Sequence, residues 1–550
     1  PEEAASLLRD AEVALGEDEV AGLHRRTEGW PARLYLAALY LRAGGPLASA
    51  AVSFGGDDRL VSQYMESEFL ARISRRQRVF LTRTAVLERM SGPLCDAVLE
   101  QSGSAATLAE LARSNMLLVP LDRRGEWYRY HHLFRDMLLA ELHRLEPGLI
   151  AVLQRRAAGW CVQNDLPEEA LEYSMAAGDV GTAAGLVEKL VVPAHRKGRV
   201  PTVNRWLRWV EDRGGIQGHP MAAVLAALFC ALTGRPAEAE RWADAVDRWQ
   251  YGDPARLGDP SVEAWAAVMR TFLCRRGAGQ MRADADEAVR RFAAQSFVTP
   301  APAFLQGIAH VLCGDLDGGD ASLEDGIGVG EEAGAHEDVA LALCERSLVA
   351  IARGDWGRAG VLADQAGAVL RRAGIEESYA TPLVCAVRAR VAVHRGDVPA
   401  ARQELVRAQR LRHLLTYALP YFAVQARIEL IHVHFALADL AGARTLVREV
   451  DELLRRRPDL GNLTGEVRAL RARLPNQRGS GAPGASALTA AELRLLPMLP
   501  THLSMPEIAG ELFLSPNTIK SQAISIYRKL GTSSRSQAVA RSRELGLLEG

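Results

Sequence analysis

The residues with the most distinctive chemistry are basic side chains near the end of the chain. From Leu512 to Arg543 the chain has six Lys or Arg residues and no Asp or Glu, whereas the formal net charge of all 550 residues is −1. Such a face would attract a polyanion, and a helix N-terminus within it would add hydrogen-bond donors. On charge alone, the segment indicates either nucleic-acid binding or a helical bundle with a solvated basic face.

Four short helices are predicted to position these side chains, because capping signals recur along the segment. Three predicted starts pair a Ser or Thr with a Glu or Gln three residues later: Thr489 with Glu492, Ser504 with Glu507, and Ser534 with Gln537. The remaining start has Ser515 as the cap and Pro516 in the first turn, and Gly531 closes that helix. Pro497 and Pro500 are expected to shorten the first helix.

The helix from Pro516 to Leu530 is the predicted DNA-recognition helix. Only Phe513 and Leu514 separate it from the helix before it, as in a helix-turn-helix. Helical spacing predicts that one set of side chains packs inward: Ile519, Ile526, Tyr527 and Leu530. It predicts that a second set faces outward: Asn517, Lys520, Ser521 and Arg528.

This region resembles the LuxR-type DNA-binding domain nearly throughout. The matching segments are Leu488–Glu492, Glu507–Ala509, Leu514–Lys520, Ile526–Gly531 and Ser533–Arg535, with Ala538. The resemblance implies that Lys520 and Ser521 approach base edges in the major groove. It places a further set of residues near phosphate contacts: Asn517, Thr518, Arg528, Lys529 and Arg535.

Two positions of the predicted recognition helix depart from the family pattern. Family members often carry His at the position of Gln522, and a basic or polar side chain at the position of Ile524. Ile524 could touch a thymine methyl group but cannot form a hydrogen bond, so the DNA sequence that the family recognises is not transferable. Both residues remain candidate DNA contacts.

The composition predicts a mainly α-helical chain of several domains. Hydrophobic residues make up 48% of the chain and aromatic residues only 6%, which is a helix-forming mixture. The seven cysteines are scattered without a Cys-x-x-Cys pair, so we expect reduced, mostly buried thiols in a cytoplasmic protein. No apolar run approaches the ~20 residues that cross a bilayer, so no membrane partner is expected.

Residues 1–58 are predicted to be a helical segment. Two amphipathic helices, Glu2 to Leu15 and Glu17 to Arg26, precede an apolar helix that reaches about Arg42. Glu28-Gly29-Trp30-Pro31 before that helix resembles the segment that follows the nucleotide-binding core in MalT-like regulators of the STAND class. Because the chain begins with neither a signal peptide nor a natural start, we expect it to be a fragment.

Residues 59–147 are predicted to form a winged-helix module. Strand-forming residues at 116–120 and 126–130 flank a turn at 122–125, so helices are followed by one β-hairpin. A winged helix could bind DNA. The segment Tyr130–Phe134 also resembles a family segment that places a His near nucleotide phosphates, so His131 and His132 have either a nucleotide-sensing role or a structural one.

No catalytic or metal-binding motif is found in the sequence. The chain contains no Gly-Lys pair, so it lacks the phosphate-binding loop of this ATPase class and is not expected to hydrolyse ATP by itself. We therefore predict no cofactor for this chain, and ATP or ADP only for a longer protein with an upstream ATPase core. There is also no HExxH, paired-Cys or Gly-x-Ser-x-Gly motif, which makes an enzyme the weakest hypothesis.

Residues 148–474 are predicted to form an array of helical repeats. Short Gly-containing turns recur, the last four at steps of about 40 residues: Gly314-Asp315, Gly354-Asp355, Gly396-Asp397 and the weaker Ala438-Asp439. They resemble tetratricopeptide-like repeats, which in MalT-like proteins form the sensor for a small-molecule or protein inducer. Several tryptophans are either surface anchors or core residues: Trp206, Trp209, Trp242, Trp249, Trp265 and Trp356.

The complete prediction is a mainly α protein with a winged-helix module and small β-hairpin, a tetratricopeptide-like α-solenoid, a flexible linker at 475–487, and a four-helix LuxR-type helix-turn-helix at 488–550. The predicted function is a bacterial transcription regulator that binds double-stranded DNA. RNA polymerase and further copies of the chain are additional partners implied by the resemblance. The alternative is a protein-interaction scaffold without sequence-specific DNA binding, which would lack a marked salt dependence for DNA.

Overall fold

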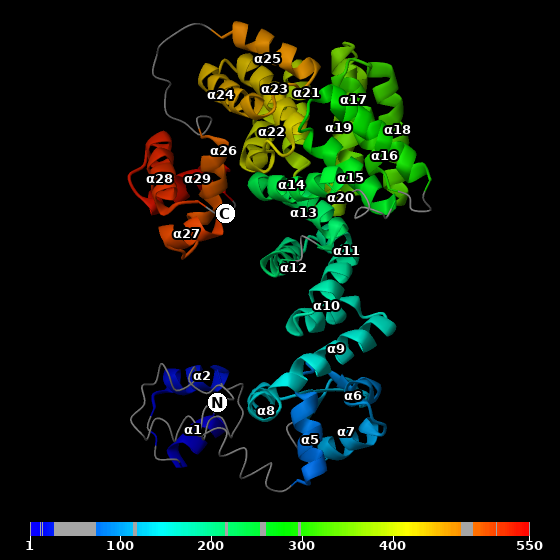
Figure 1. Ribbon diagram of the computed structural model, residues 1–550. Helices are drawn as coiled ribbons and strands as arrows, with labels where there is room; N and C mark the ends of the chain where they lie inside the picture. The colour runs from blue at the N-terminus through cyan, green and yellow to red at the C-terminus, as the bar shows by residue number, and fades with distance from the viewer. Residues whose placement is uncertain are drawn as a thin grey trace. The chain divides into compact units, whose positions relative to one another are not determined.

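The computed structural model in Figure 1 describes residues 2–10, 13, 15–26, 73–113, 118–214, 218–252, 260–294, 299–474, 488–512 and 514–548. Three predicted features lie wholly or partly outside these ranges: the apolar helix to Arg42 with Glu28-Gly29-Trp30-Pro31, the first residues of the strand at 116–120, and the linker at 475–487. The described residues fall into two compact units, Pro1–Leu190 and Val191–Gly550.

The first unit begins with the helices α1 (Glu2–Asp10) and α2 (Glu17–Arg26). The second helix has the predicted bounds. The first is shorter than the predicted Glu2 to Leu15, and a hydrogen bond from Val13 N–H to the carbonyl of Leu8 closes its end. A hydrogen bond from an N–H group to the carbonyl five residues earlier is typical of the C-terminal end of a helix, where the chain leaves the helical path.

The winged-helix module consists of the helices α5 (Arg75–Thr84), α6 (Gly92–Leu99), α7 (Ser104–Arg113) and α8 (His132–Leu145), with the strands β1 (Met90–Ser91), β2 (Leu118–Pro120) and β3 (Trp127–Tyr130). The predicted hairpin is confirmed, since Leu118 pairs antiparallel with Tyr130. Its turn is held by Asp122, whose carboxylate accepts hydrogen bonds from main-chain N–H groups that include Trp127 at 2.8 Å. These bonds lower the pKa of Asp122.

A third strand completes this small sheet, which has the order β1-β3-β2. Met90 of β1 lies opposite Tyr128 of β3. The sequence analysis missed β1 because two residues are too few to show an alternating pattern. In the core beneath the sheet, Tyr130 contacts Phe134 edge to face, with their ring centroids 5.8 Å apart. The helices α9 (Pro147–Gln163) and α10 (Pro167–Ala176) follow this module.

The second unit contains the helical repeats, and the division between the units falls within α11 (Val180–Arg196). The subsequent helices are α12 (Val200–Asp212), α13 (Pro220–Leu232), α14 (Pro236–Gly252), α15 (Pro260–Leu273), α16 (Ala278–Ala293), α17 (Ala301–Leu312), α18 (Leu316–Glu332), α19 (His336–Ala352), α20 (Trp356–Ala373), α21 (Thr381–His394), α22 (Val398–Leu411), η4 (Arg412–Leu414), α23 (Pro420–Ala436), α24 (Leu440–Arg456) and α25 (Asn462–Ala472). Most consecutive helices pack against each other, as in stacked helix pairs. The predicted α-solenoid is confirmed.

The predicted Gly-Asp turns explain why the helices of this array start where they do. Asp355 caps α20 by accepting a hydrogen bond from Arg358 N–H at 2.9 Å, and Asp397 caps α22 in the same way from Ala400 N–H at 3.0 Å. The preceding Gly354 has a φ of 76°, a left-handed conformation that favours glycine. Ala438 adopts a φ of 58° at the corresponding place in the weaker turn, at a cost of about 1–3 kcal/mol.

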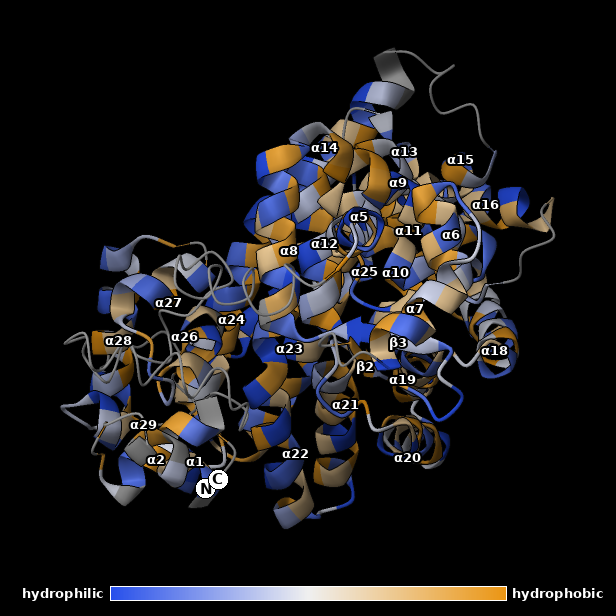
Figure 2. Cartoon of the chain, turned by 90° about the horizontal axis from the view of Figure 1, so that it is seen from below, coloured by the Kyte–Doolittle hydropathy of each residue, from blue (hydrophilic) through white to orange (hydrophobic). Residues whose placement is uncertain are grey.

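Apolar side chains fill the spaces between the helices of the array. Along α22 the buried Ala401, Leu405 and Ala408 recur at helical spacing. Figure 2 shows that hydrophobic and hydrophilic residues alternate along the helices of the array. Trp206 and Trp242 are 1% and 2% exposed, so both are core residues. The other four predicted tryptophans are half-buried: Trp209, Trp249, Trp265 and Trp356. Six of the seven cysteines are buried, and Cys313 is exposed.

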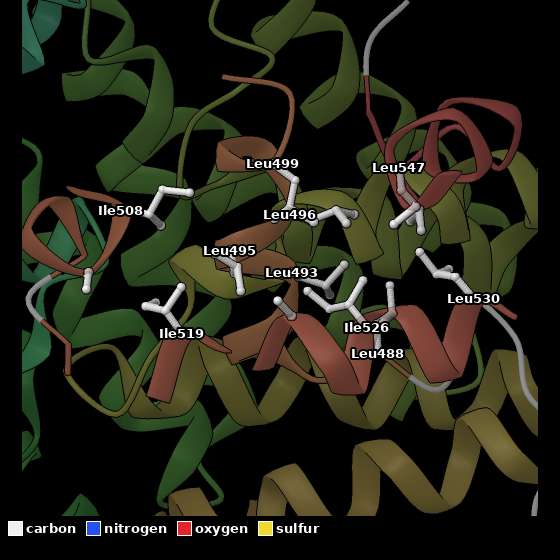
Figure 3. Close-up of a cluster of buried hydrophobic side chains, with 13 residues drawn as sticks. Leu488, Leu493, Leu495, Leu496, Leu499, Ile508, Ile519, Ile526, Leu530 and Leu547 are labelled. Atoms are coloured by element: carbon white, nitrogen blue, oxygen red, sulfur yellow. The ribbon is translucent and has the colours of Figure 1, made fainter. Parts of the chain in front are cut away.

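The terminal domain has the four predicted helices: α26 (Ala490–Leu495), α27 (Met505–Glu511), α28 (Pro516–Leu530) and α29 (Arg535–Glu544), with the 3₁₀ turn η6 (Leu496–Met498) after the first. Thr489 and Ser504 form the predicted capping boxes with Glu492 and Glu507. Pro497 lies in η6, which confirms the predicted early end of the first helix. Leucine and isoleucine side chains from all parts of the domain meet in one core (Figure 3).

Candidate nucleic-acid interface

The helix α28, which is the predicted recognition helix, has one buried face and one exposed face. Ile519, Ala523, Ile526 and Leu530 are buried in the domain core. The exposed side chains are Asn517, Lys520, Ser521, Ile524 and Arg528. Because these positions are three or four residues apart, they form a single stripe along the helix. The structure therefore brings five of the predicted contact residues together on one open surface.

Ile524 is the unusual member of this exposed stripe. Its side chain is 66% exposed, although it is a large aliphatic group that normally packs inside a protein. Lys520 lies one turn before it and Arg528 one turn after it, so an apolar patch is placed between two cations. A surface of this kind could contact a thymine methyl group while its neighbours contact phosphate or base edges.

Thr518 and Gln522 lie at the edge of the stripe, and both are half-buried. The Thr518 hydroxyl is 2.7 Å from the Ser515 hydroxyl, and Thr518 N–H donates to the same Ser515 oxygen at 3.1 Å. Thr518 therefore takes part in capping α28. The Gln522 Oε1 atom is buried without a hydrogen-bond partner among the described residues.

Lys529 has a contact within the domain that the sequence analysis did not predict. Its ammonium group donates to Glu492 Oε2 at 2.6 Å and to Oε1 at 2.8 Å. The same carboxylate accepts a hydrogen bond from Thr489 N–H at 2.7 Å, so it caps α26 and also holds α28. Glu492 is only 4% exposed. No short-range pattern in the sequence reports this pairing, because Lys529 and Glu492 are 37 residues apart.

Arg535, another predicted phosphate contact, is also engaged within the domain. Its guanidinium donates to four main-chain carbonyl oxygens between η6 and α27: Leu499 at 2.7 Å, Leu503 at 2.8 Å, Thr501 at 2.8 Å and Met498 at 3.2 Å. Arginine suits this place because five N–H donors in a fixed plane can satisfy several carbonyl groups at once. No sequence motif reports such a contact.

The charge available to DNA is therefore smaller than the sequence suggests. Residues 488–548 contain seven Lys or Arg and four Asp or Glu. Lys529 is paired with Glu492, and Arg541 with Glu544 at 2.7 Å. The exposed cations on the recognition helix are Lys520 and Arg528. Arg543 of α29 is also exposed. Few exposed cations release few counterions, so one domain alone is expected to bind DNA weakly.

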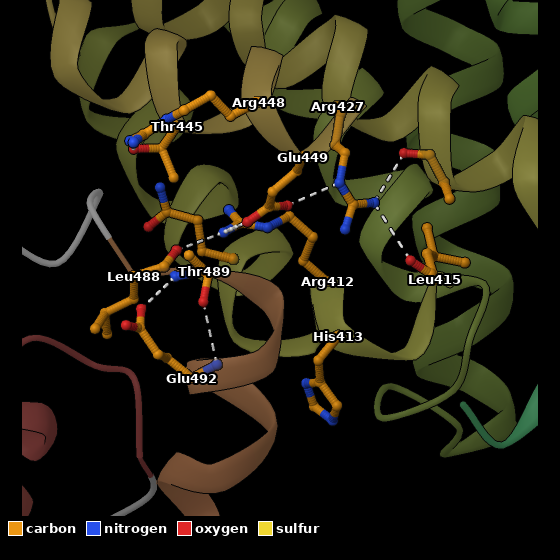
Figure 4. A network of polar contacts seen from close by, with 12 residues as sticks. Arg412, His413, Leu415, Arg427, Thr445, Arg448, Glu449, Leu488, Thr489 and Glu492 are labelled. Carbon is orange, nitrogen blue, oxygen red and sulfur yellow. Dashed lines mark hydrogen bonds and ion pairs between the residues drawn. The ribbon is translucent and has the colours of Figure 1, made fainter. Parts of the chain in front are cut away.

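The domain also contacts the repeat array through its first residue (Figure 4). Arg412 donates to the carbonyl oxygen of Leu488 at 2.8 Å and to Glu449 Oε1 at 3.1 Å. The other oxygen of Glu449 accepts from Arg427 Nε at 2.8 Å. Arg412 is 1% exposed and Arg427 is 2% exposed, so this is a buried charge network. Its geometry satisfies both oxygens of Glu449, as a buried carboxylate requires.

His413 lies next to this network and is neutral at pH 7. Burial lowers its pKa to about 4, and the positive charges of Arg494 and Arg412 add to the effect. Arg494 belongs to α26 of the terminal domain, and burial lowers its pKa as well. A protonated His413 would therefore face two like charges at this contact.

The two candidate nucleotide-sensing residues lie side by side at the start of α8. Their rings are tilted against each other with centroids 4.4 Å apart, and His131 and His132 are both half-buried. Within the described ranges, no three His, Cys, Asp or Glu side chains are grouped as a metal site would require. In the same part of the chain, every helix is too short or too polar to cross a bilayer.

Comparisons with known families match the two ends of the chain. Residues 66–150 match the MalT winged helix domain, and residues 486–542 match the bacterial regulatory proteins of the luxR family. One segment similar to a MalT winged helix domain and one similar to a luxR-family domain thus lie before and after the helical array in the sequence.

Individual relatives match only part of the chain. The serine/threonine-protein kinase PknK of Mycobacterium tuberculosis is 33% identical over 189 residues, which are 34% of this chain and 17% of that protein. The transcriptional regulator MalT of Klebsiella pneumoniae is 31% identical over 165 residues, 30% of this chain and 18% of that protein. The matches thus span less than a fifth of the length of either relative.

Among solved structures, a STAND protein with a tetratricopeptide repeat sensor, PH0952 from Pyrococcus horikoshii, is similar with a TM-score of 0.45 and 15% sequence identity. The similarity covers 90% of this chain and 72% of that one.

Proposed function

We propose that this chain is a sequence-specific DNA-binding transcription regulator whose helical-repeat array controls a LuxR-type helix-turn-helix. The exposed stripe on α28 carries the proposal. Its members span about three turns of one helix, contain no carboxylate, and begin at a capped helix N-terminus. This arrangement suits insertion into the major groove, with Lys520 and Ser521 at base edges and Asn517 and Arg528 near phosphates.

The domain organisation in this proposal follows the predicted boundaries. The winged-helix module is assigned to residues 59–147, the sensor array to 148–474 and the DNA-binding domain to 488–550, whereas the predicted segment 1–58 lies partly and the predicted linker 475–487 wholly outside the described residues. The contact between Arg412 and the Leu488 carbonyl supports control by the array, because it connects a repeat helix to the first residue of the DNA-binding domain. An inducer at the array would act by changing how this domain is held.

Weak binding by a single domain makes assembly part of the proposed mechanism. Several chains on repeated half-sites would combine their few cations and base contacts, which raises the overall affinity without any new contact. The proposed partners are therefore double-stranded DNA and further copies of the chain, with RNA polymerase as the partner at a promoter.

Selection from random duplexes at two salt concentrations tests the proposal. The chain is expected to enrich particular sequences, and Lys520→Ala should weaken their binding by about 1–3 kcal/mol if Lys520 contacts a base. Lys197→Ala is the matched control, since it removes an exposed lysine of the array. Binding without sequence preference, or equal binding by Lys520→Ala, would favour the scaffold hypothesis.

A further inference from the structure

A cavity of about 380 Å³ lies inside the last part of the array, among α17, α19, α21, α23 and α25. One face of α23 lines it with Gln425, Glu429 and His432, which helical spacing places on the same side. Arg390 of α21 and Glu466 of α25 also line it. Buried polar side chains such as these need hydrogen-bond partners, because an unpartnered polar group costs free energy when it is removed from water.

Two hydrogen-bond acceptors in this cavity are buried without a partner. Gln425 is 4% exposed and Glu429 is 7% exposed. Among the described residues, neither Gln425 Oε1 nor Glu429 Oε2 has a hydrogen-bond partner. The amide of Gln425 is oriented by its Nε2 atom, which donates to Glu345 Oε2 at 3.0 Å. A native protein usually supplies a donor for such acceptors, from a side chain, water or a ligand.

Arg390 and Arg473 line the cavity together with Glu429 and Glu466, but the ion pair of Glu429 is poorly formed. Arg390 Nε is 3.5 Å from Glu429 Oε2, an ion pair that forms no hydrogen bond. Burial raises the pKa of Glu429 to about 7, and the negative charge of Glu466 adds to this effect although Arg390 opposes it. His432 adds no positive charge at pH 7, because burial and the charges of Arg390 and Arg473 lower its pKa to about 4.

We propose that this cavity is a binding site for a small molecule with a primary ammonium group, which donates hydrogen bonds to Glu429 and Gln425. An ammonium group supplies several donors and a positive charge together, which suits two acceptors without a partner, one of them on a carboxyl group. Arg390 Nε, which also has no hydrogen-bond partner, is available to an oxygen atom of the same ligand.

The site connects to the terminal domain through α23. Gln425 and Glu429 lie on either side of Arg427, which points into the Glu449 and Arg412 network that holds Leu488. A ligand that shifts α23 would therefore act on that network. The effect of the ligand on DNA binding rests on the proposed function. The binding of the ligand to the cavity does not, and it is measured without DNA.

Isothermal titration of the full chain tests the binding. The probes are n-butylamine and 1,4-diaminobutane, with 1,4-butanediol and butanoate as uncharged and anionic matches. Both amines should bind saturably and release protons at pH 7, since a bound cation lowers the pKa of Glu429. The number of protons released is measured by repeating the titration in buffers of different ionisation enthalpy. It should be up to about half a proton per site, because Glu429, with a pKa of about 7, is half-protonated at pH 7.

Variants connect this binding to the cavity. Glu429→Gln should weaken amine binding by at least about tenfold and remove the proton release. Glu466→Gln at the exposed rim should weaken it less, and provides a second test if Glu429→Gln does not fold. Glu452→Gln, which removes an exposed carboxylate of α24, is the matched control and should bind normally. Equal binding of the diol or butanoate, no saturable amine binding at millimolar concentration, or amine binding unaffected by the two cavity variants would each overturn the proposal.

Discussion

The ammonium group of Lys529 lies 2.6 Å from Oε2 and 2.8 Å from Oε1 of Glu492, so the last turn of the recognition helix is bound to the first helix of the domain. Glu492 also caps its own helix through Thr489 N–H. One buried carboxylate thus fixes the position of α28 relative to α26. Two lysines of α28 consequently have different surroundings, because Lys520 is exposed and Lys529 is half-buried.

These surroundings predict different effects for the two lysines. Lys529→Ala should lower the unfolding free energy of the terminal domain by about 1–3 kcal/mol, because it leaves Glu492 buried without its counter-ion. Hydrogen exchange of α26 and α28 measures this change. Lys520→Ala is the matched control and should leave exchange unchanged, while it weakens DNA binding by about 1–3 kcal/mol, as expected for a base contact. If Lys529→Ala leaves the hydrogen exchange of α26 and α28 unchanged and lowers the salt dependence of DNA binding by about one unit of slope, Lys529 is a phosphate contact.

Ile524 should contribute to DNA sequence preference without contributing to stability. Its side chain is 66% exposed, so Ile524→Ala should change the unfolding free energy by less than about 0.5 kcal/mol. If the side chain contacts a thymine methyl group, replacing that thymine with uracil should cost about 1 kcal/mol of binding. The variant should be insensitive to the same replacement. Thymine and uracil duplexes that bind the unsubstituted chain equally would exclude this contact.

Local signals in the sequence were sufficient to predict the helices of the terminal domain and the repeat turns. Thr489 and Ser504 cap their helices through neighbours only three residues away, and Asp397 does the same in the array. Such bonds depend on short spacings that can be read directly from the chain. The inward and outward faces of α28 were predicted for the same reason, since helical periodicity alone determines them.

Contacts between distant residues could not be predicted in this way. Lys529 and Glu492 are 37 residues apart, and Arg412 and Leu488 are 76 apart. The polar cavity combines residues from separate repeats, so no single segment contains its pattern. The predicted phosphate contacts at Lys529 and Arg535 came from position in a family pattern, which does not report whether a charge is already paired.

Arg412 should determine how firmly the terminal domain is held by the array. Arg412→Gln removes the donor to the Leu488 carbonyl, and a hydrogen bond from a charged group contributes about 1.5–3 kcal/mol. Glu449 keeps its bond to Arg427 at 2.8 Å, so the array should remain folded. Faster hydrogen exchange is therefore expected in α26 and η4 and not in α23. Arg402→Ala, an exposed substitution on α22, is the control and should change neither. Exchange in α26 that does not change in Arg412→Gln would show that this contact does not hold the domain.

The pH dependence of array stability should report the buried Glu345. Its side chain is fully buried, and burial raises its pKa to about 8, although the hydrogen bond from Gln425 opposes the shift. The folded protein therefore keeps this proton up to about pH 8, whereas the unfolded chain releases it near pH 4.3. The contribution of Glu345 to the free energy of unfolding is therefore fully present below about pH 4.3 and is lost as the pH rises to about 8.

Between about pH 7 and about pH 8 the unfolding free energy of the array should fall by roughly 1 kcal/mol on account of Glu345. In this range the opposite effect of His413 and His432 is small, because both are neutral in the folded state and mostly neutral in the unfolded chain, where histidine titrates near pH 6.5. Urea unfolding at several pH values, followed by tryptophan fluorescence, measures the slope. Glu345→Gln should flatten it, since the amide does not titrate, and the exposed Glu452→Gln should leave it unchanged. A slope that persists in Glu345→Gln would assign the titration to another group, with Glu429 and its pKa of about 7 as the next to be replaced.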